Sequence, residues 1–225
     1  MAHVLDNPIY NALTTGNKHL AVEAGGAFYF KDDVAPFAGL KNNSAADFEA
    51  LLKNAPDDRV FVIFTPEQLH VPDYFKVLRD FKMFQMVYEA DTPPTEMESS
   101  ITSLEDEHVE EMLALTRLTN PGPFLQRTID FSNYTGVFTD GNLIAMAGHR
   151  MQPLPYVEIS AVCTHPEHTG KGHAAKLLLE QARRIIAAGK TPFLHVLQEN
   201  TGAIKVYERI GFKTRVPILG YVLSK

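Results

Sequence analysis

The sequence has no tryptophan and one cysteine, Cys163, among its 225 residues. A single cysteine excludes an intramolecular disulfide framework and is typical of a protein in a reducing compartment. The N-terminus lacks a basic segment followed by an apolar one, and no apolar run approaches the roughly 20 residues that a membrane helix needs. We therefore expect a soluble, cytoplasmic protein with no membrane partner and with enough apolar residues (45%) for one large domain or two small ones.

The chain also lacks an excess of positive charge. Its net charge of −6 argues against non-specific nucleic-acid binding. The distribution is uneven: residues 1–169 hold 11 Lys or Arg and 24 Asp or Glu, whereas residues 170–225 hold 10 and 3. Lys- and Arg-rich helix surfaces would produce this asymmetry, and so would a site for a small polyanion near the C-terminus.

Residues 1–90 predict a small α/β region. Two short strands are expected around Gly25–Gly26, and Ser44 is a good N-cap for a helix that Pro56 ends. Residues 59–64 are suited to a buried strand, and residues 74–89 to two further extended segments. The region is compatible with a degenerate copy of the second half, a substrate lid, or a structural dock. The polar, proline-rich residues 91–100 are the predicted linker.

Residues 101–225 predict a mixed sheet covered by helices, an α/β (α+β) fold. A capping box at Ser103 predicts a first helix. An Asp140–Gly141 turn predicts a hairpin. The later expected elements are a strand at 156–164, a helix from 174 to 188, a strand at 192–197, a helix at 200–211 and a last strand.

Three histidines, two glycines and a lysine lie in the ten residues HPEHTGKGHA, His165 to Ala174. The histidines have no Cys or carboxylate partner at a recognised ligand spacing, so we expect no metal. A nucleotide P-loop fails at two positions, because Gly172 stands where Ser or Thr must bind magnesium and His165 replaces the first glycine. Two interpretations remain. One is an ordinary strand-to-helix turn; the other is a diphosphate cradle made by the backbone N–H groups of residues 170–174, with Lys171 adding charge.

Two motifs in this half resemble the GNAT superfamily of acyl-CoA-dependent N-acetyltransferases. The run EISAVCTHPEHTGKGHAAKLL is followed, 26 residues after Ala174, by NTGAIKVYERIGF. Family members carry Arg/Gln-x-x-Gly-x-Gly/Ala at a helix start, then Asn-x-x-Ala-x-x-x-Tyr-x-x-x-Gly-Phe. The chain matches these patterns at Gly172, Ala174, Asn200, Ala203, Tyr207, Gly211 and Phe212. Thr169 stands in the Arg/Gln position, which removes a charge-assisted phosphate contact. The sequence HPEHTGKGHA is most similar to that of the glycine N-acyltransferase-like branch of this superfamily.

The resemblance, which covers about residues 95–225, implies a fold, a co-substrate and most of a site. The fold is the acyl-CoA N-acyltransferase fold, with residues 1–90 as an extra N-terminal region. Acetyl-CoA is the implied co-substrate, and its pantetheine arm would lie along the backbone of Val162, Cys163 and Thr164. The implied pyrophosphate-binding residues are Thr169, Gly170, Lys171, Gly172, His173 and Ala174. Asn200 would hold pantetheine, cap its helix, or do both, and Ala203 completes the implied binding set.

Direct transfer from a thioester to an amine requires an acid for the leaving thiolate and a base for the ammonium. Tyr207 is the implied acid; a tyrosine that only packs the core is the alternative. For the base we expect Glu158, because a carboxylate in an apolar strand should have a raised pKa. Alternation along the strand places Glu158 on the face of Ser160 and Val162. The alternatives are that Glu158 is exposed at an edge and that the base is His149, His195 or water.

Cys163 is a candidate nucleophile for a two-step transfer, but no His–carboxylate pair lies near it in sequence, which favours a small buried residue. The predicted function is transfer of an acetyl or other short acyl group from acetyl-CoA to a primary amine by direct attack. Two alternatives stay open: a non-catalytic acyl-CoA-binding or sensing module, and a protein N-acetyltransferase in which residues 1–90 recognise a peptide. The expected acceptor is a small-molecule or peptide amine, and the expected oligomeric state is a monomer or homodimer.

Overall fold

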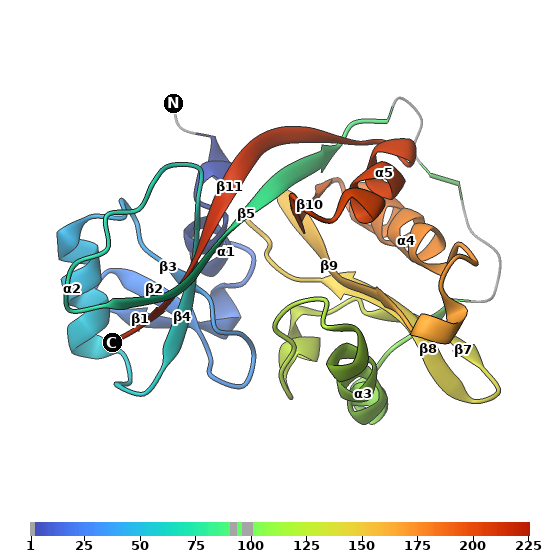
Figure 1. The fold of residues 1–225 in the computed structure, drawn as a ribbon, viewed down its shortest axis with the longest axis horizontal. Coiled ribbons are helices and arrows are strands. Elements are labelled where there is room, and N and C mark those ends of the chain that lie inside the picture. The colour runs from blue at the N-terminus through green and yellow to red at the C-terminus, as the bar shows by residue number, and fades with distance from the viewer. Residues whose placement is uncertain (1–2, 91–93, 96–100) are drawn as a thin grey trace.

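The computed structural model describes residues 3–90, 94–95 and 101–225, in which five α-helices and eleven strands are found (Figure 1). The helices are α1 (Pro8–Thr14), α2 (Ala45–Asn54), α3 (Val109–Thr119), α4 (His173–Ala187) and α5 (Thr201–Arg209). The strands are β1 (Ala21–Ala24), β2 (Ala27–Phe30), β3 (Ala38–Gly39), β4 (Val60–Thr65), β5 (Lys76–Tyr88), β6 (Thr102–Ser103), β7 (Thr135–Thr139), β8 (Asn142–His149), β9 (Tyr156–Thr164), β10 (Thr191–Leu197) and β11 (Phe212–Ser224).

Eight of these strands form one mixed sheet, in the order β4-β11-β5-β10-β9-β8-β7-β6. Strands β9 and β10 are parallel, and the other neighbouring pairs are antiparallel. Strands β1 to β3 form a small second sheet beside α2. The predicted fold class, a mixed sheet covered by helices, is therefore confirmed.

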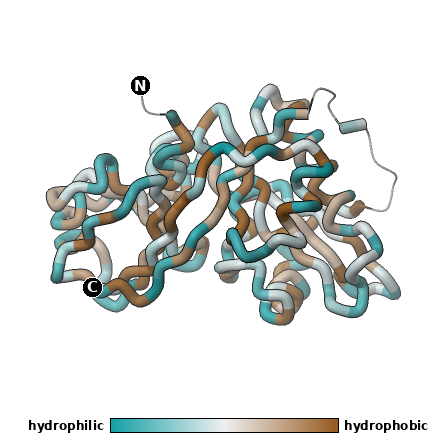
Figure 2. The backbone as a smooth tube through the Cα atoms, turned by 45° about the horizontal axis from the view of Figure 1, so that its top comes forward, coloured by the Kyte–Doolittle hydropathy of each residue, from teal (hydrophilic) through white to brown (hydrophobic). Residues whose placement is uncertain are grey.

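Helices cover both faces of the sheet around β8, β9 and β10. Helix α4 contacts all three strands and buries the apolar stripe Leu177, Leu178, Ala182 and Ile185. Helix α3 packs on the other face and buries its apolar residues Val109, Met112, Leu113 and Leu115. Figure 2 shows that the hydrophobic segments gather in the interior strands, whereas the outer loops are mostly hydrophilic. The α3 face and the α4 face thus have separate hydrophobic clusters.

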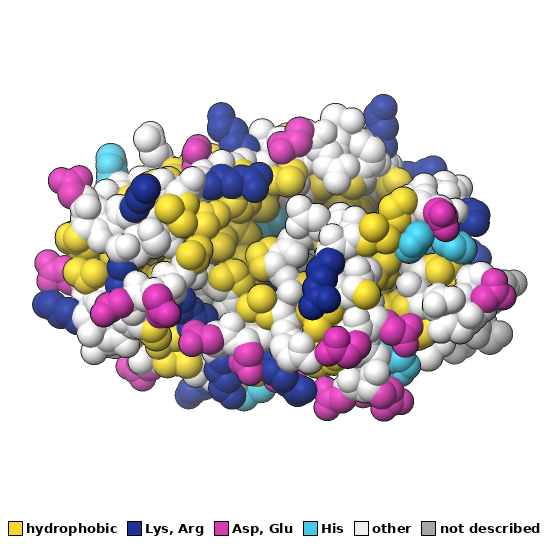
Figure 3. Space-filling view, turned by 60° about the horizontal axis from the view of Figure 1, so that its bottom comes forward, with side chains coloured by type: hydrophobic (Ala, Val, Ile, Leu, Met, Phe, Trp, Pro, Cys, Tyr) yellow, Lys and Arg dark blue, Asp and Glu magenta, His cyan; other side chains and the backbone are white. Residues whose placement is uncertain are grey.

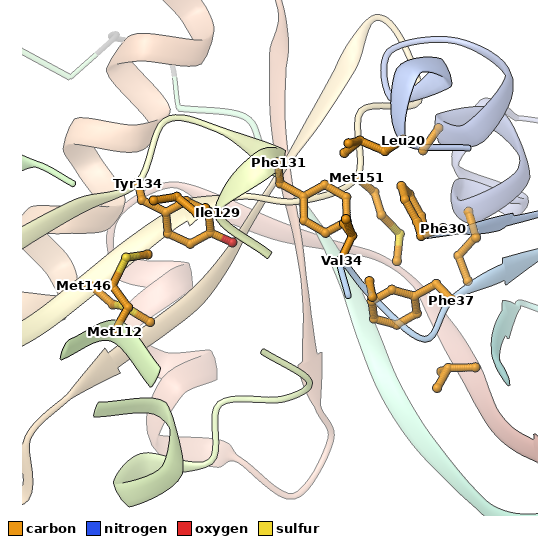
Figure 4. Close-up of a cluster of buried hydrophobic side chains, with 14 of the residues drawn as sticks. Leu20, Phe30, Val34, Phe37, Met112, Ile129, Phe131, Tyr134, Met146 and Met151 are labelled. Atoms are coloured by element: carbon orange, nitrogen blue, oxygen red, sulfur yellow. The ribbon is translucent and has the colours of Figure 1, made fainter. Parts of the chain in front are cut away.

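The two halves of the chain share the hydrophobic cluster on the α3 face. Phe30 and Phe37 from the first half pack in it with Phe131 and Met146 from the second (Figure 4). The rings of Phe30 and Phe131 meet edge to face at 5.0 Å. Strand β5 also pairs with β10 and β11, so a strand of the first half lies inside the sheet of the second. The division at residues 91–100 stays a prediction, and only positions 94–95 of that linker are among the described residues.

Two local predictions are wrong. Residues 74–89 form one long strand, β5, because Lys76–Tyr88 contains no glycine or proline and pairs with β11 along nearly its whole length. Ser103 does not cap a helix, because it pairs with Thr135 in the edge strand β6. The turn that leads into α3 is capped instead by Glu105 together with His108. Both errors arise because pairing with a distant strand overrides a local signal.

Gly39 is predicted to be essential for packing α1 against β3. A Cβ there would lie 2.5 Å from the backbone Cα of Tyr10 in α1, and backbone cannot rotate away. We expect Gly39→Ala to lower the free energy of unfolding by about 1–3 kcal/mol, measured by urea denaturation. The control is Gly202→Ala in α5, whose added Cβ meets nothing nearer than 3.9 Å. Better helix propensity should stabilise that variant by up to about 1 kcal/mol. Equal stability of the two variants would contradict the packing argument.

Candidate functional site

Strands β9 and β10 separate in the middle of the sheet. They pair only where Tyr156–Glu158 runs beside Thr191–Phe193. Beyond this point β9 continues to Thr164 and β10 continues to Leu197, but the two strands no longer pair with each other. Backbone groups on the facing edges of a parallel pair normally bond each other. Beyond Glu158 and Phe193, the backbone groups on the facing edges of β9 and β10 therefore do not bond each other.

A β-bulge follows directly in β9. Met146 of β8 is paired with Cys163, whereas Gly148 is paired with Ser160, so β9 contains one extra residue. At the bulge, Ala161 has a φ of +51°, which lies in the left-handed region of backbone conformation that non-glycine residues rarely adopt. The bulge reverses the alternation of side chains: Val162 packs in the cluster of α4 and α5, and Cys163 packs in the cluster of α3. The prediction that Val162 shares a face with Glu158 is therefore wrong.

The segment between β9 and α4 presents a row of unused backbone donors. Gly170 and Gly172 have φ values of +76° and +82°, and no atom lies within 4 Å of a Cβ added to either. Within the described chain, the N–H groups of residues 170–175 donate to no protein acceptor. Together with the start of the 15-residue helix α4, these N–H groups have the geometry expected of the anion cradle, which was one of the two interpretations of the sequence.

Polar side chains at this turn are exposed and close together. The hydroxyl of Thr169 donates to the Pro166 carbonyl at 2.9 Å, which leaves its oxygen free to accept. The ammonium of Lys171 lies 3.5 Å from Nδ1 of His168. Burial is the largest cause that lowers the pKa of His173, followed by the charge of Lys176. His173 is thus biased toward its neutral form, and Lys171 and Lys176 supply positive charge beside it.

Helix α5 carries the second motif. The side chain of Asn200 caps the helix by accepting from the Ala203 N–H at 3.1 Å, as predicted. Ala203 and Tyr207 pack in the same cluster as Val162, so the structure brings these three residues to one face of the sheet. Burial raises the pKa of Tyr207 to about 12, and its hydroxyl bonds to no group in the described chain. The hydroxyl is thus protonated at neutral pH and free to donate.

Glu158 occupies the other face and is fully buried. Arg150 holds it with two bonds, Nε to Oε2 at 2.8 Å and Nη2 to Oε1 at 2.5 Å, and Nδ1 of His195 donates to Oε1 at 2.7 Å. Burial alone would raise the pKa of Glu158, but the opposing effects of Arg150 and His195 together lower it to about 2. The predicted raised pKa is therefore wrong, because Arg150 and His195 stabilise the ionised carboxylate by more than burial disfavours it.

The polar contacts continue from His195 across the sheet. The Gln85 amide donates to Nε2 of His195 at 3.1 Å and to the Leu5 carbonyl at 2.9 Å, and its oxygen accepts from Nε of Arg215 at 2.6 Å. Arg215 is in turn paired with Asp6. With both ring nitrogens of His195 engaged in this way, its neutral Nδ1–H form fits the network.

The other two candidate proton or thiol groups are poorly placed for catalysis. His149 faces α4, where burial lowers its pKa to about 4, and its Nε2 has no hydrogen-bond partner in the described part of the chain. Burial raises the pKa of Cys163 to about 11, so this residue is a thiol at neutral pH. The buried, unreactive interpretation of Cys163 is the one that fits.

A small pocket opens on the α3 face beside the bulge. Its lining residues are Pro121, Gly122, Pro123, Phe124, Thr128, Tyr134, Arg150, Ser160 and Ala161. Figure 3 shows that the surface between the two halves is hollowed and that hydrophobic side chains line most of the hollow. Over residues 3–90, 94–95 and 101–225, no cluster of three or more potential metal ligands occurs, and no helix is long and apolar enough to cross a membrane.

Comparison with known proteins identifies the family. A putative acetyltransferase of the GNAT family from Novosphingobium aromaticivorans is 33% identical, and the similarity covers 100% of this chain and 99% of that one with a TM-score of 0.92. The chain belongs to the GNAT family. The family model of FR47-like proteins also matches residues 134–218, which contain β7 to β10, α4, α5 and most of β11.

More distant GNAT structures share the fold. A GCN5-related N-acetyltransferase from Kribbella flavida is 16% identical over 98% of this chain and 96% of that one, with a TM-score of 0.65. A GNAT-family acetyltransferase from Colwellia psychrerythraea is 15% identical over 100% and 98% of the two chains, with a TM-score of 0.56. No curated protein matches the sequence significantly. The family membership supports an acyltransferase with general N-acetyltransferase activity and the acyl-CoA N-acyltransferase fold.

The candidate site residues thus lie on two different faces of the sheet. The residues from Thr169 to Ala174 and the Val162–Ala203–Tyr207 group lie toward α4 and α5, whereas Glu158 lies toward α3. Sequence reasoning missed Arg150 and Tyr134, which line the pocket. The signal that could have found Arg150 is its position eight residues before Glu158, at the start of the loop of residues 150–155 that joins the antiparallel strands β8 and β9.

The Glu158 carboxylate is predicted to stabilise the fold in a pH-dependent way. Its folded pKa of about 2 lies below its ordinary value of 4.5, so its contribution is complete above pH 4.5 and is lost as pH falls toward 2. We expect Glu158→Gln to lower the free energy of unfolding at pH 7 by about 3–5 kcal/mol, because Arg150 is left buried and unpaired. Urea denaturation at pH 7 and pH 3 should show the deficit shrinking at the lower pH.

The control is Glu89→Gln, which removes an exposed carboxylate paired with Lys213. It should change stability by less than about 1 kcal/mol at either pH. A Glu158→Gln deficit that is the same at both pH values would show that the carboxylate is not held ionised.

Proposed function

We propose that this GNAT protein transfers an acetyl group from acetyl-CoA to the primary amine of a small molecule by direct attack. The observation that carries the proposal is the row of six backbone N–H groups at residues 170–175, which lies between the end of β9 and the start of α4 and has no acceptor within the described chain. A diphosphate is the ligand that such a row at a helix N-terminus suits.

The residues present fit acetyl-CoA. Gly170 and Gly172 leave open space over the donors, and Lys171 can reach a phosphate oxygen. The gap between β9 and β10 suits the pantetheine arm, with the backbone of Val162 to Thr164 along one side. Asn200 is already engaged as the cap of α5, so its side chain would contribute to pantetheine binding only through its amide N–H groups. When bound, acetyl-CoA supplies the thioester whose carbonyl carbon is attacked.

In the proposed reaction the amine nitrogen bonds to the carbonyl carbon, and the carbon–sulfur bond breaks. Tyr207 donates its phenolic proton to the departing sulfur, a role for which a hydroxyl without another partner and with a pKa raised to about 12 is suited. The nitrogen sheds its surplus protons to water, and one of them restores the Tyr207 phenol. The products are the N-acetylated amine and the free thiol of CoA.

Glu158 enters the proposal as a positioning residue. Both of its oxygens are bonded to Arg150 and His195, and its pKa of about 2 makes it a weak base near neutrality. Water is therefore the proposed proton acceptor, and Glu158 orients Arg150 at the pocket on the α3 face. Its role would be to fix the walls of the acceptor site.

Three finer assignments stay predictions from the sequence. The run from His165 to Ala174 supports placement in the glycine N-acyltransferase-like branch. The single cysteine supports a cytoplasmic protein, and a monomer or a homodimer is compatible with the sequence. A peptide acceptor is the alternative to a small amine, and the small size of the pocket favours the small amine.

Tyr207→Phe is predicted to slow turnover without weakening the binding of acetyl-CoA. Loss of the acid should lower kcat by about 100-fold, and the dissociation constant measured by calorimetry should change less than about two-fold. Release of CoA thiol in the presence of a panel of amines provides the rate. Tyr74→Phe, an exposed tyrosine in the first half, is the control. An unchanged kcat in Tyr207→Phe would show that another group protonates the sulfur.

Thr169→Arg is predicted to tighten acetyl-CoA binding, because it adds a charge beside the proposed diphosphate site. We expect the dissociation constant to fall roughly 3- to 10-fold at low salt, and the gain to shrink at high salt. The control is Thr139→Arg, which adds the same charge at an exposed position in β7. Equal effects of the two variants would place the diphosphate elsewhere.

A further inference from the structure

The pocket on the α3 face contains three side chains that can donate hydrogen bonds and that have donors to spare. We propose that Arg150, Tyr134 and Ser160 form a subsite for a negatively charged group, and that this group belongs to the acceptor amine. The inference rests on the proposed function, and it names the class of acceptor: a small amine that also carries an acidic group.

Arg150 supplies the charge of the subsite. Its Nε and Nη2 atoms bond to Glu158, whereas Nη1 has no partner in the described residues. The guanidinium lies 4.9 Å from the ring centroid of Phe37 and 5.9 Å from that of Phe64. Its position is fixed by the carboxylate on one side and by the rings on another, and its side chain is only 12% exposed. A fixed guanidinium with a spare N–H₂ group suits an oxyanion.

Tyr134 supplies a second donor. The residue is 2% exposed, and its hydroxyl has no hydrogen-bond partner within residues 3–90, 94–95 and 101–225. Its ring lies directly on Gly148, where an added Cβ would come within 2.3 Å, and it packs edge to face with Phe124. Figure 4 shows the hydroxyl end on the side of Phe131, away from Met146. Because Tyr134 lines the pocket and its hydroxyl has no protein partner, the hydroxyl can donate to a ligand there.

The remaining polar groups at the pocket make it selective for an anion. Ser160 precedes the bulge residue Ala161, and its hydroxyl is not bonded to another described group. Thr128 is already saturated, since it donates to the Val34 carbonyl and accepts from the Leu125 N–H. Both oxygens of Glu158 are engaged by Arg150 and His195. The pocket therefore offers donors and no free carboxylate that a second ammonium group could bind.

The position of the pocket assigns the anion to the acceptor rather than to acetyl-CoA. The free backbone donors of residues 170–175 and the proposed acid Tyr207 lie toward α4 and α5, whereas the pocket lies on the α3 side of β9. In a direct transfer the thioester belongs to acetyl-CoA, and the acceptor amine approaches it from a side that the rest of acetyl-CoA does not occupy. An acidic group held at Arg150 would orient the amine of the acceptor toward the separation of β9 and β10.

The test uses four amines that share a two-carbon linker and differ in one end group. They are β-alanine, 2-aminoethylphosphonate, taurine and the neutral control propylamine. We expect at least one of the three acidic amines to have a kcat/KM about ten-fold or more above that of propylamine, consistent with a hydrogen-bonded charge pair. The order among the three distinguishes a carboxylate from a phosphonate and a sulfonate. Calorimetry in the presence of CoA measures binding independently of turnover.

Tyr134→Phe removes one donor whose loss leaves no protein group unpaired. It should raise KM for the preferred acidic amine by about ten-fold, and leave KM for propylamine unchanged. The matched control is Tyr88→Phe, another buried tyrosine, which packs in the cluster on the α4 face. The double variant Arg150→Met with Glu158→Gln removes both members of the charged pair, so that neither is left buried without the other, and it should abolish the preference.

The outcomes separate this inference from the proposed function. Equal or faster acetylation of propylamine would overturn the acidic acceptor and leave the acetyltransferase intact. Binding of an acidic amine that Tyr134→Phe weakens, with no turnover of any amine, would support the subsite and overturn the proposed reaction. A preference for succinyl-CoA over acetyl-CoA with propylamine would place the acidic group on the acyl donor and overturn the assignment to the acceptor. Equal effects of Tyr134→Phe and Tyr88→Phe would overturn the role of Tyr134.

Discussion

A fully buried carboxylate at the point where two strands of a sheet separate has to be neutralised, and the arrangement around Glu158 does this with Arg150 and His195. The consequences reach both halves of the chain. Arg150 lies against Phe37 and Phe64, so the first 90 residues supply the wall that keeps the guanidinium in place. His195 is in turn fixed by Gln85 of β5. The opening between β9 and β10 is therefore held by polar groups from strands that are distant in sequence.

The two faces of the sheet carry two candidate binding sites that are built from different chemical groups. On the side of α4 and α5, the proposed cofactor site consists mainly of backbone N–H groups at residues 170–175 and depends on the left-handed conformations of Gly170 and Gly172. On the side of α3, the pocket consists of side chains from four separate segments of the chain. The bulge at Ala161 connects them, since it turns Val162 toward one side and Cys163 toward the other.

Sequence patterns predicted the elements whose causes are local. Ser44 caps α2, Asp140–Gly141 makes the hairpin turn with positive φ at both residues, and Asn200 caps α5, all within a few residues of the signal. The patterns failed where a distant partner decides. Strand β5 is continuous because β11 pairs along it, and the pKa of Glu158 is low because Arg150 reaches it. The bulge had no signal either, because a positive φ at an alanine is set by the tertiary structure.

This division also bears on how the family pattern can vary. A site made of backbone hydrogen-bond donors tolerates a change of side chain, because the N–H groups remain when the residue is replaced. Thr169 in the usual Arg/Gln position removes one charge, but the six N–H donors of residues 170–175 stay in place. A site made of side chains does not tolerate such a change, because replacing the residue removes the binding group itself. Replacing Arg150 changes the charge of the pocket, the partner of Glu158 and the packing against Phe37 and Phe64 at once. In the proposed mechanism, then, recognition of acetyl-CoA depends on backbone conformation, and recognition of the acceptor amine depends on a few coupled side chains.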